Sequence, residues 1–305
     1  MIRKEIKIYL QERRSLGYKL YDEEHLLYQF DDYLEKLKAT MITQELAVRW
    51  ACLPNNCKPS HWARRLSIVR IFARYYSAIN PHTEIPSQGL LPYRYQRATP
   101  HIYTEKQIIN LLNKTKSLKS KSGLKALTYE TLLGLLAVTG MRINEIVSLD
   151  QGDVDLKKSV IIVRKAKLDR TRLIPLHAST VNVLDQYIKH RGNIVPKPKT
   201  NGFFISEHGT RLTTFTVRYN FNKLSCQTGL RHPSDKYGPR LHDFRHTLAV
   251  NIMMEWYKCG KNVEKLLPKL ALFMGHRHLN DTYWYMTATP ELLKLAVERS
   301  TERIN

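Results

Sequence analysis

The stretch Thr139-Gly140-Met141-Arg142-Ile143-Asn144-Glu145 ends one helical pattern and begins another. An apolar run over residues 126–138 predicts a helix, and Gly140 is well placed to cap it and turn the chain into a second helix over 142–149. Arg142 then lies at a helix N-terminus, where backbone N–H groups and a guanidinium together suit a phosphate oxygen. Arg142 and Glu145 are also spaced i, i+3, so an ordinary helix salt bridge explains the pair equally well.

The pattern becomes extended after this stretch. Two β-branched runs, 159–163 and 171–176, flank residues 164–170 and predict a hairpin or a short sheet. From Lys157 to Arg172 the chain has seven basic residues and one acidic residue, so the loop between the strands is strongly positive. A charged edge that prevents strand aggregation explains part of this charge but does not require so many cations.

Outside this region the chain is mainly helical, with a proline-rich break in the middle. Apolar periodicity predicts four N-terminal helices, over residues 2–16, 22–37, 44–54 and 60–80. Thr43 is a predicted N-cap of the third, and Thr104 with Gln107 predicts a capping box after the break. The C-terminal part is predicted to have a short strand over 202–206 and helices over 213–302, with loops at 231–238, 260 and 276–280.

The chain carries 49 Lys and Arg against 27 Asp and Glu, a formal net charge of +22. This excess favours a polyanionic partner, and nucleic acid is favoured over an anionic membrane because no segment concentrates the charge on an amphipathic helix. A solvated basic surface without a specific partner is the alternative. Because no apolar run reaches 18 residues and four scattered cysteines form no Cys-x-x-Cys pair, we expect a soluble cytoplasmic protein without disulfides or a cysteine zinc site, associated with the nucleoid if the source is prokaryotic.

The basic residues of the fourth helix and of the proline-rich segment are candidate DNA-backbone contacts. No acidic residue lies between Pro54 and Thr83, which favours phosphate contact over an ordinary solvated helix face. The predicted contacts are Arg64, Arg65, Arg70 and Arg74 on the helix, Arg94 and Arg97 in the linker, and Lys165 and Arg170 in the hairpin.

Two C-terminal motifs combine histidines with an arginine or with aromatic residues. In Leu-His-Asp-Phe-Arg-His at 241–246, His242 and Arg245 share one helix face and converge on one oxygen-rich group. In Met-Gly-His-Arg-His at 274–278, His276 precedes Tyr285 by nine residues, close enough to meet it across a loop. His242 and His246 also have zinc-pair spacing, but no glutamate, cysteine or carboxylate cluster completes a site, so we expect no metal.

The motifs follow one another in a fixed order: an arginine, a hairpin lysine, His-x-x-Arg, Gly-His and a tyrosine. In this order the chain resembles the tyrosine recombinase family of phage integrases and Xer-type recombinases. The resemblance covers most of the sequence. It implies a mainly α fold with a small β-sheet, arranged as two domains that clamp DNA. The implied parts are a helical, SAM-like core-binding domain over 1–82, a basic linker over 83–101 and a catalytic domain over 102–305.

The same resemblance implies which residues are catalytic. They are Arg142, Lys167, His242, Arg245, His276 and Tyr285, with Glu145 supporting the first arginine. Lys165 is the alternative lysine, because this chain has Ala-Lys-Leu at 166–168 where the family often has Gly-Lys-Gly. Tyr283 is the rival nucleophile, although the spacing favours Tyr285.

The implied reaction is site-specific DNA recombination through a covalent 3′-phosphotyrosine, without metal, ATP or another cofactor. The implied partner is double-stranded DNA bound by four protomers, and a mobile-element role is favoured. The last helix, 290–303, would pack on its own chain or on a neighbour. The alternatives are a type IB topoisomerase, which shares the chemistry, and a nonenzymatic DNA-binding regulator, which is disfavoured because the tyrosine and the arginines are present.

Overall fold

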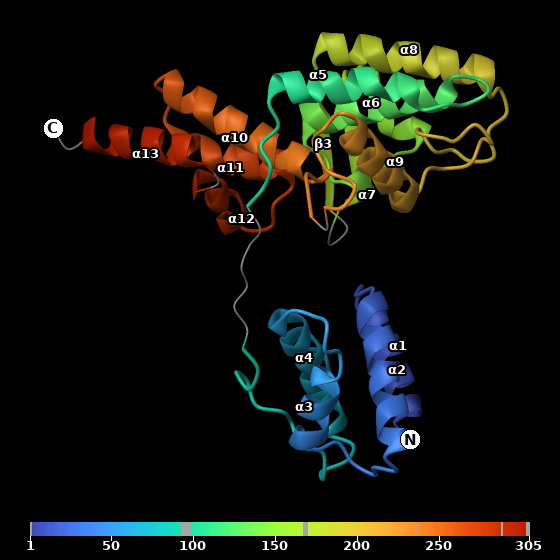
Figure 1. Ribbon diagram of the computed structural model, residues 1–305, viewed down its shortest axis with the longest axis vertical. Helices are drawn as coiled ribbons and strands as arrows, with labels where there is room; N and C mark the ends of the chain where they lie inside the picture. Colours follow the sequence, from blue (N-terminus) through green and yellow to red (C-terminus); the bar gives the residue numbers. More distant parts are fainter. Residues whose placement is uncertain (1, 93–98, 167–169, 236, 288, 303–305) are drawn as a thin grey trace. The chain divides into compact units, whose positions relative to one another are not determined.

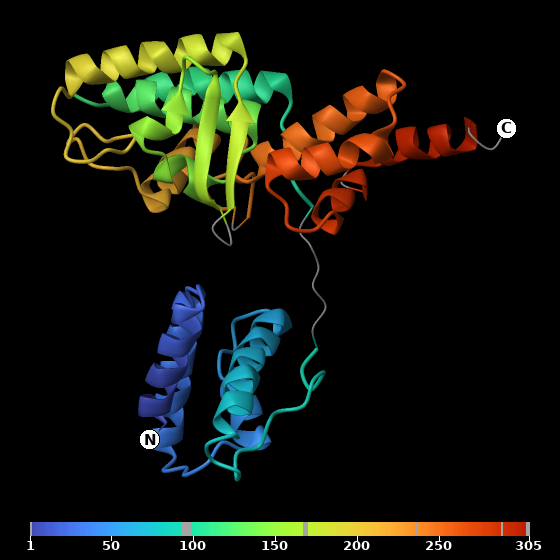
Figure 2. The ribbon, with the colours of Figure 1, turned by 180° about the vertical axis from the view of Figure 1, so that it is seen from behind.

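A computed structural model describes residues 2–92, 99–166, 170–235, 237–287 and 289–302 (Figures 1 and 2). The chain divides into two units, residues 1–98 and 99–305. Most described residues are helical and one small sheet is present, so the predicted fold class is confirmed. No helix within the described ranges is long and apolar enough to cross a membrane.

The N-terminal unit has four helices around one apolar core. They are α1 (Arg3–Ser15), α2 (Tyr21–Lys36), α3 (Gln44–Cys52) and α4 (Pro59–Tyr76). All four are predicted by the sequence, although α4 ends before the expected Asn80. Thr43 caps α3 as expected, because its hydroxyl accepts a hydrogen bond from the Leu46 N–H at 3.2 Å. Phe30, Trp50 and Phe72 are fully buried between the helices.

Arg65 lies in this core and not on the surface. Its side chain is 6% exposed, its guanidinium carbon lies 3.8 Å from the centroid of the Trp50 ring, and its Nη2 donates to the Trp50 carbonyl at 3.0 Å. The predicted DNA contact of Arg65 is therefore wrong. Helical spacing places Arg65 on the same stripe as Val69 and Phe72, where the indole face and a carbonyl compensate its charge.

The first residues of the expected linker pack on the N-terminal unit. The Glu84 carboxylate accepts a hydrogen bond from the Gln44 N–H at 2.7 Å, and the Ser87 N–H donates to the Gln44 side chain at 3.0 Å. Leu91 packs against the core of this unit. The segment after α4 is therefore anchored to the start of α3. Arg94 and Arg97 lie outside the described residues.

The C-terminal unit has a three-stranded antiparallel sheet in the order β1-β2-β3, which shares a core with five helices and with Phe244 from the start of a sixth. The strands are β1 (Val154–Asp155), β2 (Val160–Ala166) and β3 (Arg170–Pro175). The helices are α5 (Glu105–Lys114), α6 (Leu124–Thr139), α7 (Ile143–Ser148), α8 (Ala178–Ile194) and α9 (Thr214–Gln227), with 3₁₀ turns at η1 (Thr115–Ser117) and η2 (Gln151–Asp153). In both views α8 runs beside α6, away from the strands (Figures 1 and 2).

The β2–β3 hairpin is confirmed, and Val163 pairs with Arg172. The strand predicted over 202–206 is wrong, because the described chain makes only isolated bridges there, at Gly202 and Ile205. The chain turns back at once, with the Ser206 N–H bonded to the Thr210 carbonyl at 2.8 Å, so no ladder extends.

A second core within this unit joins the C-terminal helices, which gather on one side of the sheet body in Figure 1. They are α10 (Asp243–Lys258), α11 (Val263–Met274), α12 (Asn280–Tyr283) and α13 (Pro290–Glu302), with the 3₁₀ turn η3 (Trp284–Thr287). Here α13 packs against α10 and η3 of its own chain. This is one of the two arrangements that the resemblance allows.

The position of Arg65 leads to a stability prediction. Replacing Arg65 with Met should lower the free energy of unfolding of the N-terminal unit by about 1–3 kcal/mol, because the variant has neither the cation–π interaction nor the carbonyl hydrogen bond. Replacing the exposed Arg74 with Met should change it by less than about 0.5 kcal/mol. Urea unfolding measures both. Equal stability of the two variants would contradict the burial of Arg65.

Candidate active site

Arg245 is the buried centre of the candidate site. Its side chain projects from the first turn of α10 and is 2% exposed. Nη1 donates to the Gly140 carbonyl at 2.8 Å, and Nη2 donates to the Met274 carbonyl. These two carbonyls end α6 and α11, so one guanidinium holds three helix termini together. An arginine has five N–H donors, which leaves donors for a phosphate.

Gly140 makes this close packing possible. Its backbone is in the left-handed region with φ +58°, as a helix C-cap requires. A Cβ at this position would lie 2.9 Å from Leu248 Cδ2, closer than real contacts allow. The cap predicted from the sequence is confirmed, and it places Arg142 two residues further along, beside Arg245.

Arg142 is the N-terminal cap residue of α7, and it is held by Glu145. The Glu145 carboxylate accepts from Arg142 Nη1 at 3.0 Å and from the Arg142 backbone N–H at 2.8 Å. Arg142 Nη2 donates to the Gly275 carbonyl at 3.1 Å. The salt bridge expected from the i, i+3 spacing is therefore present, and it fixes a guanidinium that remains partly exposed.

The two histidines of the motifs lie close to both arginines. Burial and the charges of Arg245 and Arg142 lower the pKa of His276 to about 3. The same causes lower the pKa of His242 to about 4, although its side chain is more exposed than that of His276. Near pH 7 both rings are therefore neutral, so each can accept or donate a hydrogen bond without adding charge.

Tyr285 lies among these groups, in η3. Its side chain is 2% exposed, and its ring stacks on the His276 ring at 5.9 Å with a tilt of 24°. The His246 ring contacts Tyr285 from another side at 5.4 Å. Tyr283 is 44% exposed. The structure thus brings Tyr285 and not Tyr283 into the aromatic contacts around His276.

Arg142 and His242 border a positively charged hollow. They line a cavity of about 440 Å³, and three further arginines face it, namely Arg218, Arg231 and Arg240. Arg240 is paired with the buried Asp243 at 2.9 Å, which fixes the start of α10. A polyanion entering this cavity would meet several cations before it reached His242.

The hairpin residues named from the sequence cannot be placed in the same way. Lys167 lies outside the described residues, and the side chains of Lys165 and Arg170 are not described either. The backbone of β2 and β3 fixes only the base of the hairpin. The assignment of the lysine to position 167 or 165 stays a prediction.

Sequence reasoning missed Arg172 and Thr282. Both Arg172 terminal nitrogens donate to Glu145, at 2.9 and 2.7 Å. The Thr282 hydroxyl shares a 2.6 Å hydrogen bond with His276 Nδ1 and so orients that ring. The alternation of β3 is a signal for Arg172, because its position falls on the same face as the buried Ile174. No comparable signal marks Thr282.

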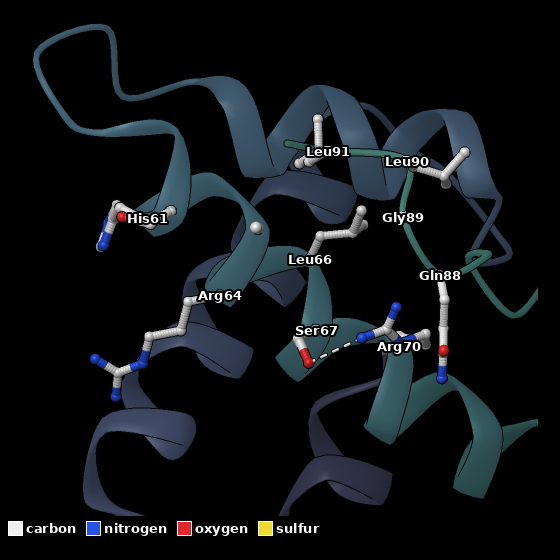
Figure 3. A pocket seen from close by; sticks show the side chains of 11 residues that line it. His61, Arg64, Leu66, Ser67, Arg70, Gln88, Gly89, Leu90 and Leu91 are labelled. Atoms are coloured by element: carbon white, nitrogen blue, oxygen red, sulfur yellow. Dashed lines mark hydrogen bonds between the residues drawn. The ribbon is translucent and has the colours of Figure 1, made fainter. Parts of the chain in front are cut away.

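In the N-terminal unit, Arg64 and Arg70 of α4 line a pocket. Figure 3 shows this hollow of about 710 Å³ between α4 and residues 88–91, with Arg64 and Arg70 at its edge. Arg70 donates to the Ser67 hydroxyl at 3.0 Å, and Arg64 pairs with Asp22 at 2.9 Å. Arg74 is exposed one turn further along α4. Three of the four predicted α4 cations thus remain accessible.

No metal cluster stands out in the described part of the chain. Among those residues, no group of three or more His, Cys, Asp or Glu side chains could hold a metal ion. His242 and His246 do lie together, with ring centroids 4.7 Å apart, but as an isolated pair.

The lowered pKa of His276 leads to a prediction about acid stability. Unfolded His276 takes up a proton near pH 6.5, whereas folded His276 does so only near pH 3, so acidification from pH 6.5 to about 4 favours the unfolded state. Replacing His276 with Gln should therefore flatten the loss of stability across this window. His278 is exposed, and its replacement with Gln is the control. Thermal unfolding at each pH measures the effect; parallel curves for all three proteins would contradict it.

Comparisons with known proteins show the family of this chain. The model of the Phage integrase family matches residues 102–291. An integrase/recombinase named y4rB from Sinorhizobium fredii is 41% identical and covers 99% of this chain and 97% of its own length. Tyrosine recombinase XerC of Chlamydia caviae is 29% identical over 78% of this chain and 70% of its own.

Two solved structures share the fold. XerH site-specific recombinase bound to a palindromic difH substrate matches with a TM-score of 0.68 at 18% identity, over 97% of this chain and 84% of its own. The Tn1549 transposon integrase in complex with transposon right end DNA matches with a TM-score of 0.67 at 17% identity, over 96% and 98%. The family match covers more than half of the chain, and y4rB matches almost all of it. The chain belongs to the phage integrase family of tyrosine recombinases.

Proposed function

We propose that this chain is a site-specific DNA recombinase that cuts and rejoins strands through a covalent 3′-phosphotyrosine. One observation carries the proposal. Five residues from distant parts of the sequence meet in one cluster: two arginines, two neutral histidines and a tyrosine, namely Arg142, Arg245, His242, His276 and Tyr285. No single structural role accounts for two guanidiniums placed together beside a tyrosine, since like charges at close range repel.

The chemistry follows from the properties of these groups. The Tyr285 oxygen forms the new bond to phosphorus while the bond to the 5′ oxygen breaks. Arg142 and Arg245 bind the nonbridging oxygens and stabilise the charge of the pentavalent transition state. Neutral His242 takes up the tyrosine proton, His276 donates a hydrogen bond to the phosphate, and Lys167 protonates the leaving 5′ hydroxyl. Because the phosphodiester energy is kept in the phosphotyrosine, rejoining needs neither ATP nor a metal.

The proposed partner is double-stranded DNA at specific recombination sites. The net charge of +22, the arginine-lined cavity beside His242 and the accessible arginines of α4 support it. The related XerH and Tn1549 structures contain DNA. We further propose that four protomers act on two sites, and that the role is the movement of a mobile element. The N-terminal unit and the catalytic unit, joined by the basic linker predicted over 83–101, would then both contact the duplex.

Replacing Tyr285 with Phe tests the nucleophile. A nicked suicide duplex that carries the DNA bordering the gene should form a covalent protein–DNA adduct with the wild-type protein and none with the Phe variant, because only the hydroxyl is removed. DNA affinity should be unchanged. Tyr283→Phe is the matched control and should form the adduct. Denaturing gel electrophoresis measures the adduct; adducts in Y285F, or their absence in Y283F, would sink the assignment of Tyr285.

Replacing Arg70 and Arg74 together with Gln tests the α4 backbone contacts. The slope of log affinity against log salt should become shallower by about 0.9 for each phosphate that the variant no longer neutralises. Any random duplex suits this measurement by fluorescence anisotropy, because phosphate binding is independent of sequence. Arg3→Gln is the control, because Arg3 already pairs with Asp32 at 3.1 Å. A double variant with the wild-type slope would contradict the role of this face of α4.

A further inference from the structure

Arg172 in the β2–β3 hairpin and Arg142 at the start of α7 both donate to the carboxylate of Glu145. The two terminal nitrogens of Arg172 grip the two oxygens of Glu145, and the side chains of Arg172 and Glu145 are only 10% exposed. The same two oxygens also accept from the Arg142 side chain and backbone. Glu145 thus holds Arg172 on one side and Arg142 on the other.

The ionisation of the buried Glu145 carboxyl depends on both arginines. Burial by itself would raise the pKa of this carboxyl, but the hydrogen bonds and charges of Arg172 and Arg142 outweigh burial and lower it to about 2. A buried carboxylate that loses one of its partners is poorly compensated, so it either protonates or moves toward the remaining partner. Either change would pull Arg142 away from its present position.

Arg172 also lies directly against Gly275. A Cβ at Gly275 would lie 2.8 Å from Arg172 Nη1 and 3.0 Å from its guanidinium carbon, so a larger residue there would displace the guanidinium from its place on Glu145. Arg142 Nη2 donates to the carbonyl of the same glycine at 3.1 Å. His276 follows immediately. Arg172 therefore contacts both Glu145, which holds Arg142, and the backbone that precedes His276.

The Nε atom of Arg172 is buried and has no hydrogen-bond partner among the described residues. An arginine that only filled space on β3 would not need to leave a buried donor unsatisfied. Within the described residues, both terminal nitrogens of Arg172 donate to Glu145 and Nε has no partner. The position of Arg172 is therefore set by the two-pronged contact with Glu145 and by the stacking on Gly275.

We propose that Arg172 is a positioning residue, which fixes Arg142 through Glu145 and fixes the His276 loop through Gly275, so that the site grips a phosphoryl group. The proposal rests on the proposed function, since it concerns the same phosphate site. Gly275 is its structural counterpart, because any larger residue there displaces the guanidinium.

Binding of orthovanadate, a phosphate analogue, tests the proposal without a target DNA. Titration followed by vanadium NMR line width should give at least about tenfold weaker binding for Arg172→Met than for the wild-type protein, because the fork on Glu145 is absent. Arg172→Lys keeps the charge but not the fork, so its affinity should fall in between. Arg142→Gln should abolish the signal, which shows that the signal reports this site.

Gly275→Ala tests the same interaction from the other side. It should weaken vanadate binding as Arg172→Met does, and the double variant should be no worse than either single one, since both disrupt the same interaction. Part of any defect at Gly275 comes from its positive φ of +67°. Gly123→Ala is the matched control, because Gly123 has φ +76° and nothing within 4 Å of an added Cβ. Its binding should equal that of the wild-type protein.

A pH series separates positioning from simple loss of folded protein. In Arg172→Met the buried Glu145 has one partner fewer, so its pKa rises and vanadate binding should weaken as the pH falls from 7 to 5. The wild-type protein should show no such weakening from Glu145, which stays ionised to about pH 2. Unfolding also increases as the pH falls, because of His276, so the folded fraction is measured at each pH and binding is expressed per folded protein. Adding Glu145→Gln to the Arg172→Met protein should remove the pH dependence that the titration of Glu145 causes.

The outcomes distinguish this inference from the proposed function. The positioning role would be overturned if folded Arg172→Met and Gly275→Ala proteins bound vanadate as tightly as the wild-type protein. Additive defects in the double variant would also overturn it. A wild-type protein that binds no vanadate would overturn it as well. Vanadate binding that depends on Arg172 in a protein that forms no covalent DNA adduct would support the positioning role and refute only the recombinase proposal.

Discussion

The candidate site depends on one buried cation. Arg245 donates to the last carbonyl groups of α6 and α11, which come from segments 105 and 29 residues away in the sequence. Removing a guanidinium from water is costly, and among the described residues the ion pairs of the site join Glu145 to Arg142 and Arg172 and leave Arg245 to other acceptors. Helix-terminal carbonyls, which have no partners within their own helices, supply the compensation. Burial lowers the pKa of Arg245 to about 10, so it stays charged at neutral pH. Arg142 and His276 each follow one of these carbonyls by two residues, so their positions depend on the same junction.

Much of the fold could be predicted because its signals are local. Thr43, Thr104 and Gly140 act as caps where the sequence places them, and the β-branched runs pair as a hairpin. The strand expected at 202–206 fails for a non-local reason. Composition there suits a strand, but no neighbouring strand of the described chain is in position to extend the pairing beyond isolated bridges. Residues 84–91 likewise have a linker's composition, yet hydrogen bonds to Gln44, forty residues away, hold their first part against α3.

The site residues could be predicted where the order of the motifs indicates which side chains lie close together. His242, Arg245, His276 and Tyr285 meet as the motifs indicate. Arg172 was missed because one more arginine in a basic hairpin attracts no notice unless strand alternation is followed residue by residue. The prediction for Arg65 was wrong for the opposite reason. Its side chain was assigned to the surface because it is charged, although its position on α4 faces the core. In both cases an aromatic ring or a carboxylate elsewhere in the chain decides the outcome, and sequence spacing does not report it.

The burial of Tyr285 has a consequence for how such a protein searches a genome. A strongly cationic chain meets duplex DNA of every sequence, and most of those encounters are unproductive. With its ring packed among His246, His276 and Trp284, the tyrosine of the free protein is out of reach of a passing backbone. Under the proposed chemistry, strand breakage then requires a rearrangement of η3, whose cost only extensive contacts at a proper site can offset. Latency, and not affinity, would protect random DNA from this protein.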